Sequence, residues 1–147
     1  MDGVTDLRMT SDERTTFLTD APRVGVLSID AAGRGPVSSP LWYTVEPDAA
    51  ISFSVGASSE KSRLLHAAGH ATLCVQSEAP PYRYVSVEGP VDEVGASTDA
   101  SRLERAHRYL GVEFGDAYFA STRAEAELTY ALRPERWASV DYNKVFA

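Results

Sequence analysis

The sequence has almost no cysteine and no long apolar run. Cys74 is the only cysteine in 147 residues, which rules out a disulfide within them. It lies in the apolar run 72–75, where we expect a buried core residue and not a nucleophile. No apolar stretch approaches the roughly 20 residues that span a bilayer, and the acidic, polar residues 1–6 do not resemble a secretory signal. We therefore expect a cytoplasmic protein without membrane contacts.

Basic residues are also scarce, since 14 Lys and Arg stand against 21 Asp and Glu and give a net charge of -7. Proteins that bind nucleic acid carry a basic face for its phosphates, so we expect no nucleic-acid partner. The length fits one domain, and 44% apolar with 24% charged residues is ordinary for a globular protein. The expected organisation is a flexible N-terminus over residues 1–9 and a single domain over residues 10–147.

The motifs of several enzyme classes are missing. Gly56 is followed by Lys61 and Ser62 without the second glycine that a P-loop needs before its lysine, and no G-x-S-x-G nucleophile elbow occurs. His66 and His70 have the i,i+4 spacing of a helical metal pair, but the glutamate of H-E-x-x-H and a third ligand are absent. We expect no metal and no catalytic side chain, a pattern typical of proteins whose cofactor does the chemistry.

The most informative segment, 51–65, combines a strand with the cationic start of a helix. Apolar residues alternate with serines, as in a strand with one buried face, and a small flexible turn follows. In the helix expected over about 60–68, Lys61, Ser62 and Arg63 lie near the N-terminus. Cations are mildly unfavourable there, so their presence beside a hydroxyl and free backbone N–H groups favours a bound anion such as phosphate. The alternative is that both cations are ordinary solvated residues, one of them paired with a neighbouring glutamate.

Short strands separated by turn residues recur along the chain. A capping box at Thr10–Glu13 starts a short helix that ends near Asp20, and Thr98–Leu110 has a helical pattern that 114–119 continue loosely. Strands are expected at 23–29, 36–45, 51–55, 71–76, 82–94 (with a bulge or bend at Gly89–Pro90), 126–133 and 136–142. About seven strands, mostly linked by hairpins, predict a mainly β fold: an antiparallel barrel with peripheral helices.

Pro40 interrupts the expected strand 36–45. Because proline cannot donate a ladder hydrogen bond, this stretch should lie at an edge, a bulge or a barrel opening. At an opening, Ser38–Leu41 would form a floor for a planar ring, with hydroxyl and backbone groups facing ring heteroatoms. The alternative, which these residues alone favour, is an edge strand without a ligand.

Five segments occur together in an order that points to a known family. They are Ser39–Tyr43, Lys61–Leu65, Pro80–Gly89, Arg108–Gly111 and Pro134–Tyr142. The chain resembles the split-barrel flavin-binding family typified by pyridoxamine 5′-phosphate oxidase, and more narrowly its actinobacterial flavin- and deazaflavin-dependent branch. The resemblance covers about Arg23 to Asn143. It implies a six- to seven-stranded antiparallel split β-barrel of the FMN-binding type, and a homodimer with cofactor clefts between its subunits.

The resemblance also implies a cofactor site. Its residues would be Ser38, Ser39, Pro40 and Leu41 along the ring, Ser54 and Val55 beside it, and Lys61, Ser62 and Arg63 at the phosphate. A partner subunit would add residues near Gln76, Tyr82 and Tyr84, with Trp137 as a further candidate, and an aromatic acceptor pocket would be lined by Trp42, Tyr84 and Trp137. Many relatives have Arg-Asn-Leu where this chain has Arg63, Leu64 and Leu65. Leu64 therefore stands in the place of the asparagine. The further basic residues of pyridoxamine oxidases have no equivalent, which disfavours vitamin B6 oxidation.

Two functions follow from the resemblance. In the first, reduced deazaflavin coenzyme F420, or FMN as the alternative, passes a hydride to a small conjugated or aromatic acceptor, and the protein supplies orientation and exclusion of water. In the second, the chain is a non-catalytic carrier or sensor of a flavin, deazaflavin or haem-type group. We prefer the enzyme and F420, although a net charge of -7 argues mildly against a strongly basic groove for the polyglutamate tail of F420.

Overall fold

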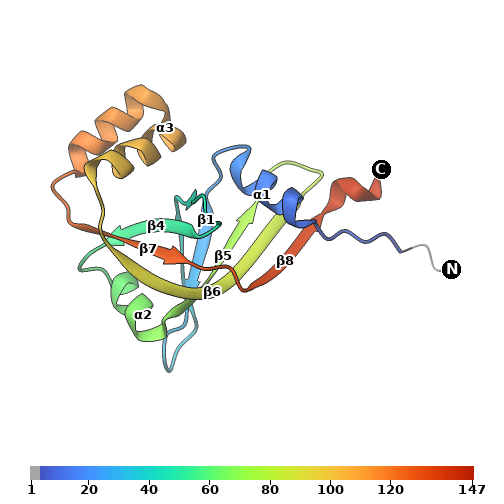
Figure 1. The fold of residues 1–147 in the computed structure, drawn as a ribbon, viewed down its shortest axis with the longest axis horizontal. Helices are drawn as coiled ribbons and strands as arrows, with labels where there is room; N and C mark the ends of the chain where they lie inside the picture. The colour runs from blue at the N-terminus through green and yellow to red at the C-terminus, as the bar shows by residue number, and fades with distance from the viewer. Residues whose placement is uncertain (1–3) are drawn as a thin grey trace.

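The structure is a computed structural model that describes residues 4–147, and its strands form one bent antiparallel system (Figure 1). Eight strands lie in these residues: β1 Gly25–Ile29, β2 Val37–Leu41, β3 Thr44–Val45, β4 Ile51–Gly56, β5 His70–Gln76, β6 Arg83–Ala96, β7 Glu127–Leu132 and β8 Arg136–Asp141. The helices are α1 Ser11–Thr19, α2 Glu60–Ala68, α3 Asp99–Thr122 and the 3-10 helix η1 Tyr142–Val145. The order β2-β1-β5-β6-β7-β4-β3, with β8 also paired to β6, confirms the predicted mainly β, split-barrel architecture.

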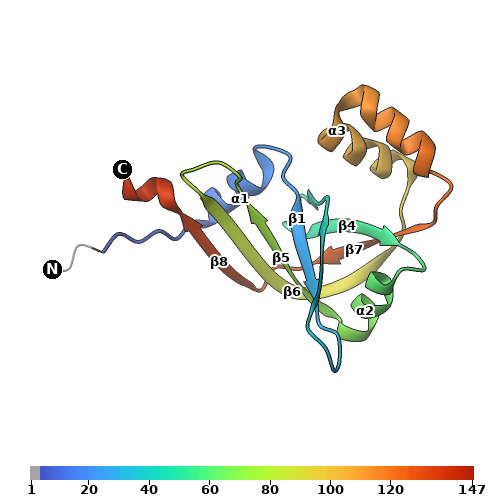
Figure 2. The same cartoon turned by 180° about the vertical axis from the view of Figure 1, so that it is seen from behind.

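The long strand β6 connects the two halves of the barrel. Its residues 83–90 pair with β5 and β8, and its residues 91–96 pair with β7 (Figure 2). Of the bulge or bend expected at Gly89–Pro90, the bulge is wrong, because the ladder to β5 continues through Pro90 and the register shift lies between Glu93 and Gly95. Gly89 has a different role: a Cβ there would lie 1.8 Å from the Arg133 carbonyl oxygen. The segment between β7 and β8 thus packs directly on the β6 backbone.

The chain between β1 and β4 leaves one ladder and enters the other. The single strand predicted over 36–45 is wrong, because β2 pairs with β1, β3 pairs with β4, and Trp42 and Tyr43 lie between them. Tyr43 is 1% exposed, and its hydroxyl donates to the Leu18 carbonyl of α1 at 2.7 Å, which attaches this segment to α1. Pro40 lies in β2, the terminal strand of the sheet order, as expected for a residue without a backbone donor.

The predicted helix starts are confirmed by their capping contacts. Thr10 and Glu13 form the reciprocal capping box of α1, and α2 begins after Ser59, whose hydroxyl accepts from the Ser62 backbone N–H at 3.1 Å. Helix α2 ends at Gly69 in the left-handed conformation, with φ 64°. No helix among residues 4–147 is long and apolar enough to cross a membrane.

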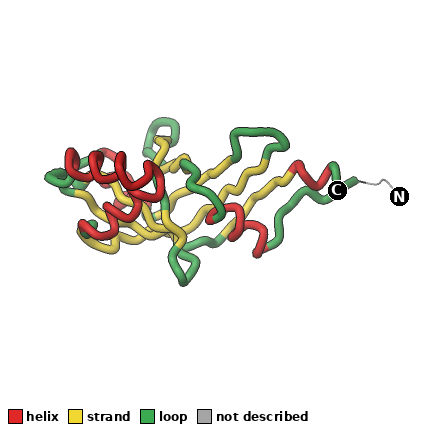
Figure 3. Tube along the Cα trace, turned by 90° about the horizontal axis from the view of Figure 1, so that it is seen from above, coloured by secondary structure: helices red, strands yellow, loops and turns green. Residues whose placement is uncertain are grey.

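Helix α3 is a helical hairpin that lies at the end of the molecule opposite η1 (Figure 3). Its two arms meet at Gly111, whose φ of 81° and ψ of 172° are not helical. Gly115 allows close contact between the arms, because a Cβ there would lie 2.7 Å from His107 Cδ2. The loosely helical pattern predicted over 114–119 is therefore a second regular arm.

The core fills the space enclosed by the strands, and its largest fully buried side chains include Tyr43, Tyr130, Phe17 and Phe53. The prediction of a buried Cys74 is wrong, because Cys74 is exposed. In β5 the neighbouring Leu73 and Val75 are both 0% exposed, so the strand has one buried face and Cys74 lies on the other.

The close approach at Gly89 predicts a large difference between two glycine substitutions. Gly89→Ala should lower the free energy of unfolding by at least about 1–3 kcal/mol, because the new methyl group would overlap the Arg133 carbonyl. Gly35→Ala is the matched control: no atom lies within 4 Å of its Cβ, and its stability should stay within about 0.5 kcal/mol of the parent. Urea unfolding of both variants checks this, and equal stabilities would contradict the packing of 133–135 on β6.

Candidate functional site

A cavity of about 260 Å³ lies between α3 and the strands β2 and β4. It brings together five of the residues that the sequence predicted for the site, which come from three separate segments of the chain. These five are Pro40, Leu41, Trp42, Ser54 and Lys61; the remaining lining residues are Arg102, Arg105, Tyr118, Phe119, Thr122 and Glu127.

Lys61 is the one member of the predicted Lys61–Arg63 phosphate anchor that lines this cavity. It lies in the first turn of α2, is half-buried, and among residues 4–147 has no carboxylate within 4.0 Å. Its ammonium group is therefore available to an anion in the cavity.

The two residues that follow Lys61 point elsewhere. Ser62 is 3% exposed, and its hydroxyl is 2.7 Å from the Tyr130 hydroxyl in the core. Arg63 lies on the exposed side of α2, 3.8 Å from Glu60, which itself pairs with Arg34 at 3.1 Å. The structure thus separates the three predicted phosphate ligands, and one of the two cations has the glutamate partner that the alternative interpretation expected.

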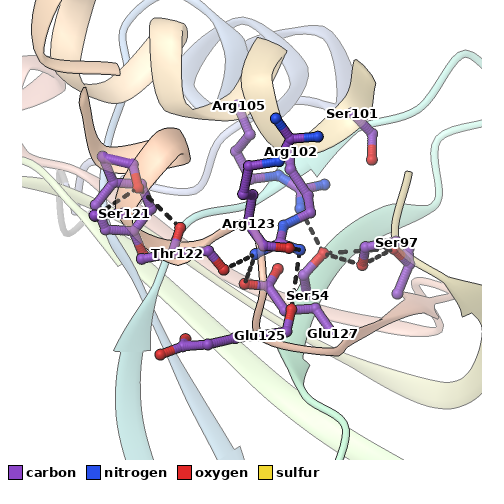
Figure 4. Close-up of polar contacts among 12 residues, drawn as sticks. Ser54, Ser97, Ser101, Arg102, Arg105, Ser121, Thr122, Arg123, Glu125 and Glu127 are labelled. Carbon is purple, nitrogen blue, oxygen red and sulfur yellow. Dashed lines mark hydrogen bonds and ion pairs between the residues drawn. The ribbon is translucent and has the colours of Figure 1, made fainter. Parts of the chain in front are cut away.

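Two arginines of α3 that were not predicted, Arg102 and Arg105, also line the cavity, and Figure 4 shows their polar contacts. Arg105 is 9% exposed and donates from Nη1 to Ser54 Oγ at 2.9 Å and from Nε to Thr44 Oγ1 at 3.2 Å. Burial lowers the pKa of the Arg105 guanidinium, because desolvation disfavours its charged form. The sequence signal that could have found both arginines is the i,i+3 spacing of Arg102 and Arg105, which places them on one helix face.

Arg102 has a structural role at the open end of the α3 hairpin. Its guanidinium donates to the carbonyl oxygens of Thr122 at 2.8 Å and Glu125 at 3.0 Å, and it pairs with the Glu127 carboxylate at 3.2 Å (Figure 4). These contacts fasten the second arm of α3 to the start of β7. Arg102 therefore shapes the cavity, and most of its charge is compensated by Glu127.

Three hydroxyl groups form a continuous hydrogen-bonded group beside Arg105. Ser54 Oγ lies 2.9 Å from Ser97 Oγ, which in turn lies 2.8 Å from Thr129 Oγ1. Each hydroxyl can donate or accept, so the group can reorient its protons toward an anion or a water molecule.

The apolar wall of the cavity is formed by the predicted ring-binding segment and by aromatic rings of α3. Trp42 stacks on Tyr109 with ring centroids 5.1 Å apart and planes 9° apart, and it contacts Tyr118 at 5.2 Å. The Tyr109 hydroxyl donates to the Arg23 carbonyl at 2.8 Å, which fixes its ring. Pro40 and Trp42 thus belong to a rigid, mainly apolar surface.

The other residues predicted along the ring do not reach this cavity. Ser38 Oγ lies 2.8 Å from Ser28 Oγ on the outer face of the sheet, and Val55 is 3% exposed in the core. Ser39 Oγ is buried and has no hydrogen-bond partner among residues 4–147.

The residues predicted to come from a partner subunit lie away from the cavity in their own chain. Gln76 lines a separate groove of about 950 Å³ beside β1 and β5. Tyr84 and Trp137 line a third depression, where the Arg14 guanidinium lies 4.5 Å from the Trp137 ring centroid. Tyr82 is 54% exposed. Within one chain, these four residues do not complete the site around Lys61.

His66 and His70 face different carboxylates. His66 Nε2 lies 2.8 Å from Glu93, and His70 Nε2 lies 3.9 Å from Glu135. In residues 4–147 no group of three or more His, Cys, Asp and Glu side chains is arranged to hold a metal ion.

No protein-family model and no curated protein matches the chain, whereas several solved structures are similar to it. A conserved hypothetical protein from Mycobacterium tuberculosis is similar in structure, with a TM-score of 0.74 and 18% identity over 100% of this chain and 94% of that one. An F420 reductase is similar with a TM-score of 0.65 and 20% identity, over 84% of this chain and 94% of the reductase. A putative pyridoxamine 5′-phosphate oxidase from Listeria innocua is similar with a TM-score of 0.60 and 13% identity, over 87% of this chain and 95% of that one.

These similarities confirm the fold that the sequence resemblance implied. The chain has the split β-barrel fold of pyridoxamine 5′-phosphate oxidase-like proteins. At 13–20% identity the comparisons establish this fold and do not establish an activity. The activity has to be inferred from the side chains of the chain itself.

The buried pair of Ser62 and Tyr130 predicts non-additive effects on stability. Ser62→Ala and Tyr130→Phe should each lower the free energy of unfolding by about 1–3 kcal/mol, because each leaves the partner hydroxyl buried without its hydrogen bond. The double variant should lose clearly less than the sum, since neither unpaired hydroxyl then remains. A double-mutant cycle in urea measures the coupling, and additive losses would contradict the pairing.

Proposed function

We propose that the chain is an oxidoreductase that binds reduced F420, or FMN as the alternative, and passes a hydride to a small conjugated or aromatic acceptor. The observation that carries the proposal is that Lys61, predicted at the phosphate, lines a single cavity with Pro40 and Leu41 of the predicted ring surface and with Trp42 of the predicted acceptor pocket. The choice of F420 over FMN rests on the sequence resemblance, and an F420 reductase is among the proteins of similar structure.

The residues around the cavity fit the parts of such a cofactor. Lys61 and the hydroxyl of Ser54 offer a positive charge and a hydrogen bond to a phosphate. Pro40, Leu41 and the rigid Trp42 offer apolar surface to a planar ring. The hydride chemistry is supplied by the cofactor when it is bound. The chain holds the phosphate and ring, and excludes water from them.

No side chain of the cavity is assigned as a catalytic acid or base. Glu127 is the only carboxylate among the lining residues, and its carboxylate is paired with Arg102 at 3.2 Å. We infer that the proton which accompanies hydride transfer comes from solvent.

We further propose that the protein is a homodimer whose partner completes the site. The cavity, at about 260 Å³, is smaller than the roughly 300–1,000 Å³ of typical small-molecule sites, so one chain encloses only part of a flavin-sized ligand. The groove beside β1 and β5 exposes Val24 by 47% and Val26 by 41%, with Gln76 alongside. Apolar side chains gathered in a groove favour contact with a second copy, which would deliver Gln76 and Tyr82 to the other subunit's cavity.

The Lys61 assignment predicts a phosphate-dependent loss of affinity. Lys61→Ala should weaken binding of F420 and FMN by about 1.5–3 kcal/mol, the contribution of a charge-assisted hydrogen bond, and should leave riboflavin, which lacks the phosphate, nearly unchanged. Titration of the protein with each cofactor, followed by fluorescence, measures this. Arg63→Ala is the matched control, and an equal loss in that variant would restore the three-residue anchor of Lys61, Ser62 and Arg63.

The same titrations test the function. If neither F420 nor FMN binds more tightly than about 1 mM, which corresponds to roughly 4 kcal/mol, the proposed function is wrong. If a reduced cofactor binds and is rapidly oxidised when conjugated or nitroaromatic acceptors are added, the enzyme is supported. Tight binding without turnover would favour the carrier or sensor.

The proposed interface predicts that one charge placed in the groove separates the subunits. Val26→Glu should convert dimers to monomers, because the interface would have to bury an unpaired carboxylate. Val112→Glu, at a position of α3 that is 65% exposed, should remain dimeric. Size-exclusion chromatography with light scattering distinguishes the species. A wild-type protein that is monomeric at every concentration would contradict the dimer.

A further inference from the structure

We propose that Arg105 forms an oxyanion subsite in the inner wall of the cavity, distinct from the Lys61 anchor, which binds a phosphate or carboxylate group of the ligand. The identity of that ligand rests on the proposed function, whereas the subsite itself rests on the contacts of Arg105.

The guanidinium of Arg105 is held in place and keeps unused donors. A guanidinium has five N–H groups. Three of them are directed to neutral hydroxyls: Nε to Thr44 at 3.2 Å, Nη1 to Ser54 at 2.9 Å and Nη2 to Ser52 at a longer 3.5 Å. One N–H on each terminal nitrogen has no partner among residues 4–147, and the side chain lines the cavity. The group is therefore pre-oriented, with donors left for a ligand.

The positive charge of Arg105 is compensated only at a distance. Among residues 4–147 no carboxylate lies within 4.0 Å of it, whereas the neighbouring Arg102 pairs with Glu127 at 3.2 Å. Glu46 is the closest acidic group through hydrogen bonds, and its carboxylate accepts from Ser52 Oγ at 2.6 Å. One hydroxyl thus stands between the two charges. Glu46 does not itself pair with the guanidinium, and the two open N–H positions are left unfilled by it.

A purely structural role explains this arrangement poorly. Burying a cation that has no directly paired anion is costly, and Arg105 is 9% exposed. Neutral hydroxyls such as those of Ser54 and Thr44 compensate little of that cost. An oxyanion in the cavity would supply the missing charge and would accept from the open donors, and a planar guanidinium suits carboxylate and phosphate equally.

The ligand group could come from the cofactor or from the acceptor, and a set of paired ligands distinguishes the two. FMN and riboflavin differ by a phosphate, and the acceptors para-nitrobenzoate and para-nitrobenzyl alcohol differ by a carboxylate. If Arg105 binds the cofactor, Arg105→Met should weaken the binding of FMN by about 10- to 100-fold and the binding of riboflavin by less than about 2-fold. If it binds the acceptor, Arg105→Met should leave both flavins unchanged. It should then raise the Michaelis constant for the nitrobenzoate about tenfold or more, with the nitrobenzyl alcohol unaffected.

Arg108→Met is the control variant, because Arg108 lies on the same helix and is exposed, with contacts to the Thr19 and Ala21 carbonyls. Arg108→Met should leave the affinities for both flavins and the Michaelis constants for both acceptors unchanged. Circular dichroism checks that each variant is folded, and Arg105→Lys, which keeps the charge but loses the fork of donors, replaces Arg105→Met if the latter does not fold. Equal effects of the Arg105 variant on the charged and the neutral member of both pairs would overturn the subsite.

A titration with inorganic phosphate separates this inference from the proposed function. The Arg105 side-chain N–H signals should shift with phosphate in the nitrogen–proton NMR spectrum of the wild-type protein, and phosphate binding should weaken in Arg105→Met and not in Arg108→Met. This result together with no flavin binding would support the subsite and refute the proposed cofactor. Phosphate binding that does not depend on Arg105, together with no flavin binding, would refute both.

Discussion

The position of the cavity depends on one strand, β6, that belongs to two ladders. Its first part holds β5 and β8, and its second part holds β7. At Gly89, where the strand passes from one set of partners to the other, the Arg133 carbonyl lies so close that only a hydrogen atom fits. This contact lies directly after the end of β7 and holds that end against β6, and β7 in turn pairs with β4, which carries Ser54 into the cavity. A backbone constraint outside the site thus determines the site's β wall.

The second wall, α3, is attached to the barrel by a small number of specific contacts. Trp42 stacks on Tyr109 at one end, and Arg102 fastens the second arm to the start of β7 at the other. Between these points Arg105 spans from the helix to the hydroxyls of β4. The contact that closes the cavity is therefore polar. Among residues 4–147 it leaves one N–H on each terminal nitrogen of Arg105 without a partner, a donor that close apolar packing would not provide.

Local signals in the sequence predicted the local structure well. Contacts between segments that are distant along the chain could not be predicted from such signals. The capping box at Thr10–Glu13 and the helix at 60–68 were predicted to within a residue or two, because caps and turn residues act over a few positions. The side chains of Lys61, Ser62 and Arg63 diverge because successive helical residues are about 100° apart, and here Ser62 lies against Tyr130 while Arg63 lies beside Glu60. Arg105 was missed because its partners lie about 50 to 60 residues away along the chain.

The charge of the whole chain is a poor guide to the charge of its cavity. The net charge of -7 argues against a strongly basic groove when it is taken as an average over the surface. The cavity nevertheless gathers Lys61, Arg102 and Arg105, and Glu127 is the only carboxylate among the residues within 4–147 that line it. At ordinary ionic strength exposed charges are screened over about 8–10 Å, whereas a half-buried cation acts on a ligand in contact with it at low dielectric. The acidic surface therefore reduces non-specific attraction of polyanions, and a single small anion meets a locally positive site.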